Sequence, residues 1–137
     1  MSKVNTSYSK VIHRLNYALT IENILRKMDE RFENLMTSQE ISIDTGFNYY
    51  IKQSKNKNLL IQNYVLTMKV LRSMSMQEQD ILIDYFYKNK TAKYVADKNS
   101  MAIRTFFRRI NELDKKFNCL YKKFQLEMLD ETEAIEE

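Results

Sequence analysis

Helix-breaking residues are almost absent from this chain of 137 residues, which contains no proline and one glycine. Proline and glycine interrupt helices more strongly than any other residues, and the frequent Leu, Met, Lys, Glu and Gln favour them. The sequence therefore predicts an all-α fold. Its length is sufficient for one domain or for two very small ones.

The N-terminal part predicts one long amphipathic helix over residues 8–36. Apolar residues recur there at helical spacing, as at Val11, Leu15 and Phe32. Such a helix would measure about 43 Å, which is long for a small domain. It predicts either a hairpin with a second helix over residues 59–74 or a dimer contact, and the hairpin is the simpler arrangement.

Residues 37–58 are the least helical stretch. They contain the only glycine, Gly46, and an alternation of apolar and polar residues that includes several aromatic rings. This pattern predicts an ordered loop or a brief helix over residues 48–53. A cluster of lysines then predicts a solvated linker or a second phosphate-contacting loop, with Lys52, Lys55 and Lys57 as its members.

Residues 74–117 have the pattern of a helix-turn-helix. An amphipathic segment over residues 77–87 is followed by a short polar break and a brief helix around Val95-Ala96. A tight turn is expected at Asn99-Ser100, where asparagine tolerates a left-handed backbone. A third helix opens near Ala102. Two helices joined by a turn, with the second both basic and amphipathic, are typical of a DNA-reading motif.

The third helix has an apolar arc and a basic arc. At 100° per residue the apolar arc consists of Ile103, Phe106, Phe107, Ile110, Leu113 and Phe117. Arg104 and Arg108 lie on the opposite side, and arginine pairs bidentately with guanine or phosphate. The apolar stripe continues through Leu120, Phe124 and Met128, which predicts an extended last helix packed on the N-terminal helices or on a second subunit.

Positive charge is concentrated around this motif. Residues 88–123 contain eleven Lys or Arg and three acids, a net charge of +8, which is the electrostatic footprint of a nucleic-acid binder. Residues 127–137 contain six acids and no base, and predict an acidic tail that is disordered after Asp130. One hypothesis is that this tail competes with DNA for the basic face; the alternative is a solubilising end without contacts.

The segment resembles region four of bacterial sigma factors and the sigma-like domain of phage transcriptional regulators of the ArpU and RinA type. The resemblance covers about the last third of the chain before the tail. It rests on residue pairs at matching offsets: Met74-Ser75, Ile81-Leu82, Phe86-Tyr87, Val95-Ala96, Arg104-Thr105-Phe106 and Arg108-Arg109-Ile110. The turn departs from the family pattern, which has Leu-Gly where this chain has Asn99-Ser100.

The resemblance implies a sequence-specific transcription regulator, encoded by a phage or prophage, that binds double-stranded DNA. Bases or phosphates would be contacted by Arg104, Thr105 and Arg108, and the DNA backbone by Arg109, Lys93, Lys98, Lys115 and Lys116. RNA polymerase is a second partner that such domains suggest. The expected organisation is an N-terminal helical region (1–73) for a hairpin or homodimer, a DNA-binding domain (74–126) and the acidic tail (127–137).

Other function classes have little support in the sequence. One histidine and one cysteine leave almost no material for catalytic triads or metal sites, and no glycine-rich loop suggests a nucleotide, so no enzyme, metal or cofactor is expected. The absence of a long apolar run and the single Cys119 fit a cytoplasmic protein without a membrane span. Two alternatives stay open: a helical assembly protein that binds no DNA, and a small terminase subunit.

Overall fold

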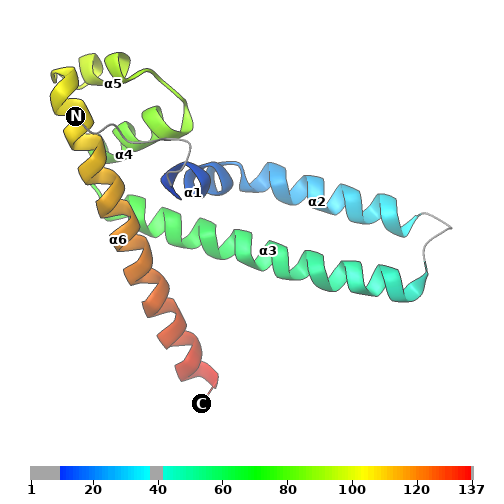
Figure 1. The fold of residues 1–137 in the computed structure, drawn as a ribbon. Helices are drawn as coiled ribbons and strands as arrows, with labels where there is room; N and C mark the ends of the chain where they lie inside the picture. The colour runs from blue at the N-terminus through cyan, green and yellow to red at the C-terminus, as the bar shows by residue number, and fades with distance from the viewer. Residues whose placement is uncertain (1–9, 38–41, 137) are drawn as a thin grey trace.

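Every element of the described residues, 10–37 and 42–136 of this computed structural model, is helical (Figure 1). In chain order the elements are α1 (Lys10–Leu19), α2 (Ile21–Met36), α3 (Ile43–Arg72), α4 (Met76–Leu82), the π-helical turn η2 (Ile83–Tyr87), α5 (Ala92–Lys98) and α6 (Ile103–Glu136). The all-α prediction is confirmed. No helix in the described ranges combines the length and the apolar character that crossing a membrane requires.

The molecule has two arms that meet at a cluster of shorter helices (Figure 1). One arm is the hairpin of α2 and α3, which run side by side in opposite directions. The other arm is the C-terminal half of α6, which leads away from the hairpin. The short elements α4, η2 and α5 lie on the far side of the junction, so the C-terminal end of α6 lies opposite α5.

The buried core lies at the junction of the arms. It contains side chains from α1, the C-terminal half of α3, α4, η2, α5 and α6, and its fully buried members include Leu15, Val70, Leu82, Phe106 and Phe117. Residues before and after position 74 therefore share one core. α1 and α3 cover the apolar stripe of α6, which is one of the two arrangements that the sequence predicted.

The N-terminal helix is broken at Thr20, so the prediction of one continuous helix is wrong. Thr20 has φ −114° and ψ 15°, outside the helical range, and its hydroxyl donates to the Asn16 carbonyl. A threonine bonded back onto the preceding turn bends a helix. A hollow of about 950 Å³ opens at this bend, lined by α1 and α2 and by Tyr64 and Met68 of α3. Tyr8, where the helix was expected to begin, lies outside the described residues.

Residues 43–58 form the first half of α3, so the predicted loop and linker are wrong there, whereas the alternative of a helix over residues 48–53 is confirmed but too short. Residues 38–41 lie outside the described residues. Ser42 caps the helix, because its hydroxyl accepts a hydrogen bond from the Thr45 amide at 3.2 Å. Gly46 is buried inside the helix. Two of the aromatic rings that produced the alternation pack against Phe32 of α2, Tyr49 at 6.1 Å and Tyr50 at 5.8 Å between ring centroids. Tertiary packing therefore offsets the roughly 1 kcal/mol helix penalty of a glycine.

The acidic tail is also helical, and the prediction that it is disordered after Asp130 is wrong. α6 runs without interruption through Glu136. At its start the tail contacts the rest of the molecule, where Lys69 lies 4.0 Å from the Glu127 carboxylate.

Candidate nucleic-acid interface

The first helix of the predicted motif begins with a capping box. The Ser75 hydroxyl accepts from the Glu78 amide at 3.2 Å, and the Glu78 carboxylate accepts from the Ser75 amide at 3.0 Å. This reciprocal pair satisfies two amides that a helix start leaves without partners. Ser75 is therefore the N-cap of α4.

The same helix ends in a π-helical turn. The Lys88 amide reaches the Ile83 carbonyl at 2.8 Å, a bond that spans five residues in place of four. Asn89 then takes a left-handed backbone, with φ 56°. Asp84 lies in this wide turn with a side chain that is 6% exposed, and it accepts a 2.7 Å bond from Lys98 on α5. The ion pair therefore fixes α5 to the end of the preceding helix.

The turn between α5 and α6 is a Schellman motif. The Met101 amide bonds to the Ala96 carbonyl at 3.0 Å, and the Ser100 amide to the Asp97 carbonyl at 3.2 Å. The residue in the left-handed conformation is Ser100, with φ 55°, whereas Asn99 has φ −102°. The expectation that Asn99 adopts that conformation is wrong. Asn99 instead donates from its side chain to the Val95 carbonyl at 2.8 Å.

The two faces of α6 separate largely as predicted. Phe106, Ile110, Leu113 and Phe117 are completely buried, and Phe107 is half-buried. Ile103 is the exception, because its side chain is 47% exposed. It lies in the first turn of α6, ahead of the residues that pack on the core, so its position on the apolar arc does not bury it.

The predicted DNA-contacting residues fall into two groups. The first group is exposed and, within the described ranges, forms no ion pair; it consists of Lys93, Arg104, Thr105, Arg108 and Lys115. The second group is paired with buried carboxylates and consists of Lys98, Arg109 and Lys116. Lys93 of the exposed group lies on α5, Arg104, Thr105 and Arg108 lie on the first two turns of α6, and Lys115 lies farther along α6.

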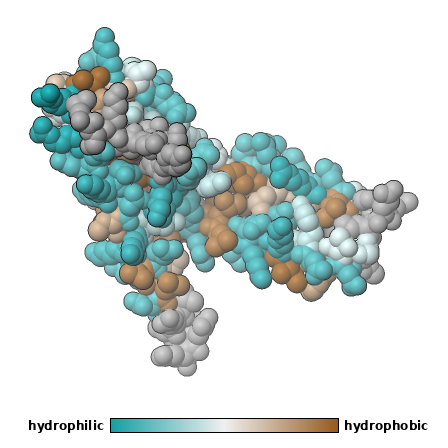
Figure 2. Space-filling view, viewed as in Figure 1, coloured by the Kyte–Doolittle hydropathy of each residue, from teal (hydrophilic) through white to brown (hydrophobic). Residues whose placement is uncertain are grey.

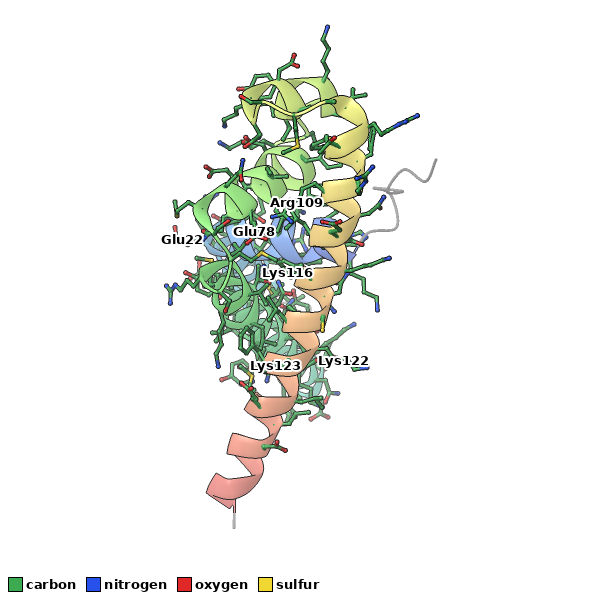
Figure 3. All side chains as sticks on the ribbon, turned by 90° about the vertical axis from the view of Figure 1, so that its left-hand side faces the viewer. Glu22, Glu78, Arg109, Lys116, Lys122 and Lys123 are labelled. Carbon is green, nitrogen blue, oxygen red and sulfur yellow. The ribbon has the colours of Figure 1, made fainter. Side chains whose placement is uncertain are left out.

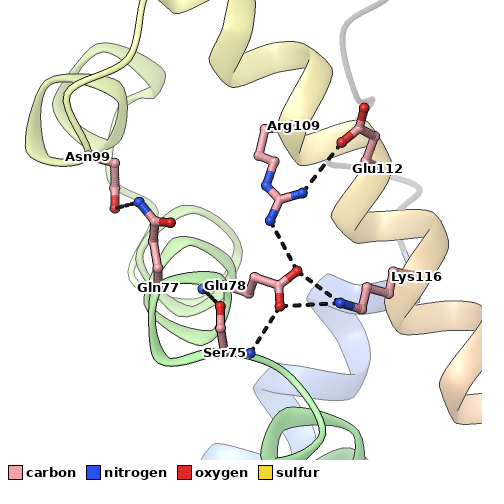
Figure 4. Close-up of polar contacts among 7 residues, drawn as sticks. All are labelled: Ser75, Gln77, Glu78, Asn99, Arg109, Glu112 and Lys116. Carbon is pink, nitrogen blue, oxygen red and sulfur yellow. Dashed lines mark hydrogen bonds and ion pairs between the residues drawn. The ribbon is translucent and has the colours of Figure 1, made fainter.

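Glu78 is the partner of two cations of the paired group, Arg109 and Lys116 (Figure 4). Its carboxylate lies 3.2 Å from Arg109 Nη2 and 3.0 Å from Lys116 Nζ, and its side chain is 8% exposed. Arg109 also lies 3.5 Å from Glu112 on the next turn. Figure 3 shows Arg109 and Lys116 extending from α6 toward Glu78, with Lys122 and Lys123 farther along the helix. The cluster therefore joins α4 to the middle of α6.

Hydrogen bonding holds the pKa of the Glu78 carboxyl below its ordinary value. The Ser75 amide has the largest effect and Lys116 adds to it, while burial acts in the opposite direction. The hydrogen bond to Asp84 raises the pKa of Lys98 in the same way. Each interaction favours the charged form of its group. Arg109, Lys116 and Lys98 therefore have part of their charge balanced within the molecule, whereas the four cations of the exposed group form no ion pair with the described residues.

The two buried acids were missed as structural residues in the sequence. Glu78 follows Ser75 by three residues before an apolar run, which is the signature of a capping box and a signal that could have identified it. Asp84 has no such signal, because its burial depends on the π-helical turn. Among the described residues, no group of three or more His, Cys, Asp or Glu side chains is arranged to hold a metal ion.

No protein-family model, curated protein or solved structure matches this chain. The residue pairs that resemble sigma region four lie on successive helices of the C-terminal part, with Ile81-Leu82 on α4, Val95-Ala96 on α5 and Arg108-Arg109 on α6.

Proposed function

We propose that the chain is a sequence-specific double-stranded DNA-binding regulator of transcription, with the N-terminal turns of α6 inserted into the major groove. One observation supports this most directly. Arg104, Thr105 and Arg108 are exposed on the opening turns of a helix that follows α5 through a tight turn. A helix of this kind presents its first residues to base edges.

The distribution of charge supports a contact with DNA at this end of the molecule. Lys93 on α5 and Lys115 farther along α6 are also exposed and would contact phosphates. Arg109, Lys116 and Lys98 instead hold the three helices together. We therefore assign base contacts to Arg104, Thr105 and Arg108, phosphate contacts to Lys93 and Lys115, and positioning roles to the three paired cations.

The test is the affinity for duplex DNA of full-length protein and two variants, Arg104→Ala and Arg108→Ala. Each should lose about 1–3 kcal/mol of specific binding while the melting temperature stays nearly constant, because both side chains are exposed. Lys122→Ala is the matched control. It removes one exposed charge from the same helix about 27 Å from Arg104 and should have little effect. Equal losses in the control would contradict the assignment.

Salt dependence tests the phosphate contacts separately. If the four exposed cations Lys93, Arg104, Arg108 and Lys115 each displace one counterion from the DNA, log K should fall with log salt at a slope of about −3.6. A slope near zero, or no binding to duplex DNA at low salt, would exclude the proposal.

The proposed regulator is phage- or prophage-encoded, acts on late genes and also contacts RNA polymerase. These parts rest on the resemblance to ArpU- and RinA-type proteins. Mapping the bound sites distinguishes this role from that of a small terminase, since regulation requires sites beside promoters and packaging requires sites at the packaging start. A helical assembly protein is the second candidate. It is favoured by the exposed apolar side chains of α3, and complete absence of duplex binding would leave it as the better interpretation.

A further inference from the structure

α3 has two apolar stripes; the described residues cover one of them and leave most of the other exposed. The covered stripe includes Leu66, Val70 and Leu71, which are buried in the core. On another side of the helix Phe47, Ile51, Ile61 and Val65 have exposed fractions of 62%, 38%, 44% and 44%. Apolar patches are visible on the hairpin arm in the space-filling view (Figure 2). A surface helix normally has one apolar face, so the second stripe requires an explanation.

The second stripe has the spacing of a coiled-coil seam. Its positions are separated alternately by four and three residues: Phe47, Ile51, Ser54, Asn58, Ile61, Val65 and Met68. In heptad terms Phe47, Ser54, Ile61 and Met68 occupy d positions, and Ile51, Asn58 and Val65 occupy a positions. We call this set the α3 seam. β-branched residues at a, together with a single asparagine at a, are typical of parallel two-stranded coiled coils.

We propose that the α3 seam pairs with the same seam of a second copy of this chain, parallel and in register. In such a pair each residue of the α3 seam lies opposite the same residue of the second copy. The polar side chains of Ser54 and Asn58 therefore contact polar side chains, and the apolar side chains of Ile51, Ile61 and Val65 contact apolar side chains. An unrelated apolar helix would leave Asn58 without a partner, which costs free energy once the side chain is buried.

The residues that flank the α3 seam favour the parallel arrangement. In a parallel pair the flanking contacts join Lys57 to Gln62 and Tyr64 to Lys69 of the second copy, without opposing like charges. An antiparallel pair could also match Ser54 with Asn58, but it would place Lys55 beside Lys55 of the second copy. Repulsion between the two lysines therefore disfavours the antiparallel pair. The hollow at the Thr20 bend adjoins the seam, because Met68 contributes to both.

The parallel pairing has a consequence for the rest of the molecule. Both copies of α3 end at the same end of the coiled coil, and α4, η2 and α5 follow α3 directly. The two copies of α6 therefore start on the same side of the dimer, related by a two-fold axis. If the proposed function is correct, the operator has two inverted half-sites. Dimerisation can be measured without DNA. A monomeric protein would therefore contradict the dimer proposal, and a protein that does not bind duplex DNA would contradict the proposed function.

Sedimentation equilibrium of the full-length protein over a range of concentrations tests the pairing. The wild type should have twice the chain mass of 16.5 kDa. Ile61→Ser should weaken dimerisation at least about tenfold, because it removes an apolar layer from both copies. Leu59→Ser is the matched control. Leu59 is a 63% exposed leucine on the same helix but outside the α3 seam, and its loss should leave dimerisation unchanged.

A monomeric wild type at all concentrations would overturn the proposal, as would equal effects of the two serine variants. Circular dichroism should show the same helix content in both variants, which separates loss of pairing from loss of folding. Orientation is tested with Ile51→Cys in a Cys119→Ser background, where mild oxidation should link two copies covalently. An antiparallel pair would place Ile51 opposite Ile61 of the second copy, so a dimer that does not crosslink at position 51 would overturn the parallel arrangement.

Discussion

Replacing Glu78 with glutamine tests the interpretation that its carboxylate braces α4 against α6. The carboxylate accepts from the Ser75 amide, Arg109 and Lys116, and the glutamine amide oxygen can keep only part of this set. Arg109 and Lys116 are 38% and 46% exposed, so solvent screening limits their joint contribution to about 1 kcal/mol. Glutamine at this position of a capping box can still accept from the Ser75 amide, so the box is kept. We expect Glu78→Gln to lower the free energy of unfolding by about 1 kcal/mol at pH 7.

The pH dependence identifies the charge as the source of this loss. The pKa of Glu78 is lowered in the folded protein, so its contribution is fully present above the unfolded pKa of about 4.3. The contribution is lost as pH falls through the folded pKa, because the wild-type carboxyl is then protonated as well. The stability difference between wild type and variant should therefore narrow as pH falls below about 4.

Urea unfolding followed by circular dichroism measures these differences, at one fixed protein concentration because pairing would otherwise change the apparent stability. Glu112→Gln is the matched control. Glu112 is 59% exposed and lies 3.5 Å from the same Arg109, so its loss should cost about 0.5 kcal/mol or less. The reasoning is refuted if the two variants lose the same stability at pH 7. It is equally refuted if the effect of Glu78→Gln is unchanged between pH 7 and pH 3.

Three further outcomes are expected. Ser100→Gly should raise the free energy of unfolding by about 1 kcal/mol, because Ser100 has φ 55° and glycine adopts that conformation without a Cβ clash; a destabilised variant in thermal melts would contradict this. Phe106→Ala should lower the free energy of unfolding by about 3–5 kcal/mol, because the ring is completely buried, and a loss below about 1 kcal/mol would mean that the site is loosely packed. Ending the chain at Leu126 should leave the affinity for random duplex DNA unchanged at low salt, because α6 holds the acidic end opposite α5 (Figure 1); tighter binding of the shortened chain in a titration would restore the competition hypothesis.

The helical periodicity of the sequence predicted those parts of the fold in which one face of a helix meets the core. Phe106, Ile110, Leu113 and Phe117 recur every three to four residues, and all four are buried. Periodicity does not show where along a helix the packing begins, and for this reason the exposure of Ile103 was not predicted.

The errors arose where local signals competed with tertiary contacts. Gly46 suggested a loop, but it lies buried in a helix whose neighbouring Tyr49 stacks on α2. Thr20 has no strong breaking tendency, and its effect depends on the bond to the Asn16 carbonyl. In the candidate interface, the sequence identified the cations but not which of them face acids. The burial of Glu78 and Asp84 depends on how α4, η2 and α5 pack together.

The continuity of α6 has a mechanical consequence. Arg104 and Phe117 belong to one uninterrupted helix, so a rotation of the helix that changes the direction of Arg104 must also move the buried Phe117 ring against α1 and α3. The orientation of the exposed arginines therefore depends on contacts several turns away, because the first turns of α6 cannot rotate separately from the rest of the helix. If the proposed function is correct, a substitution that loosens α1, for example at the fully buried Leu15, should reduce sequence discrimination without altering any residue assigned to DNA contact.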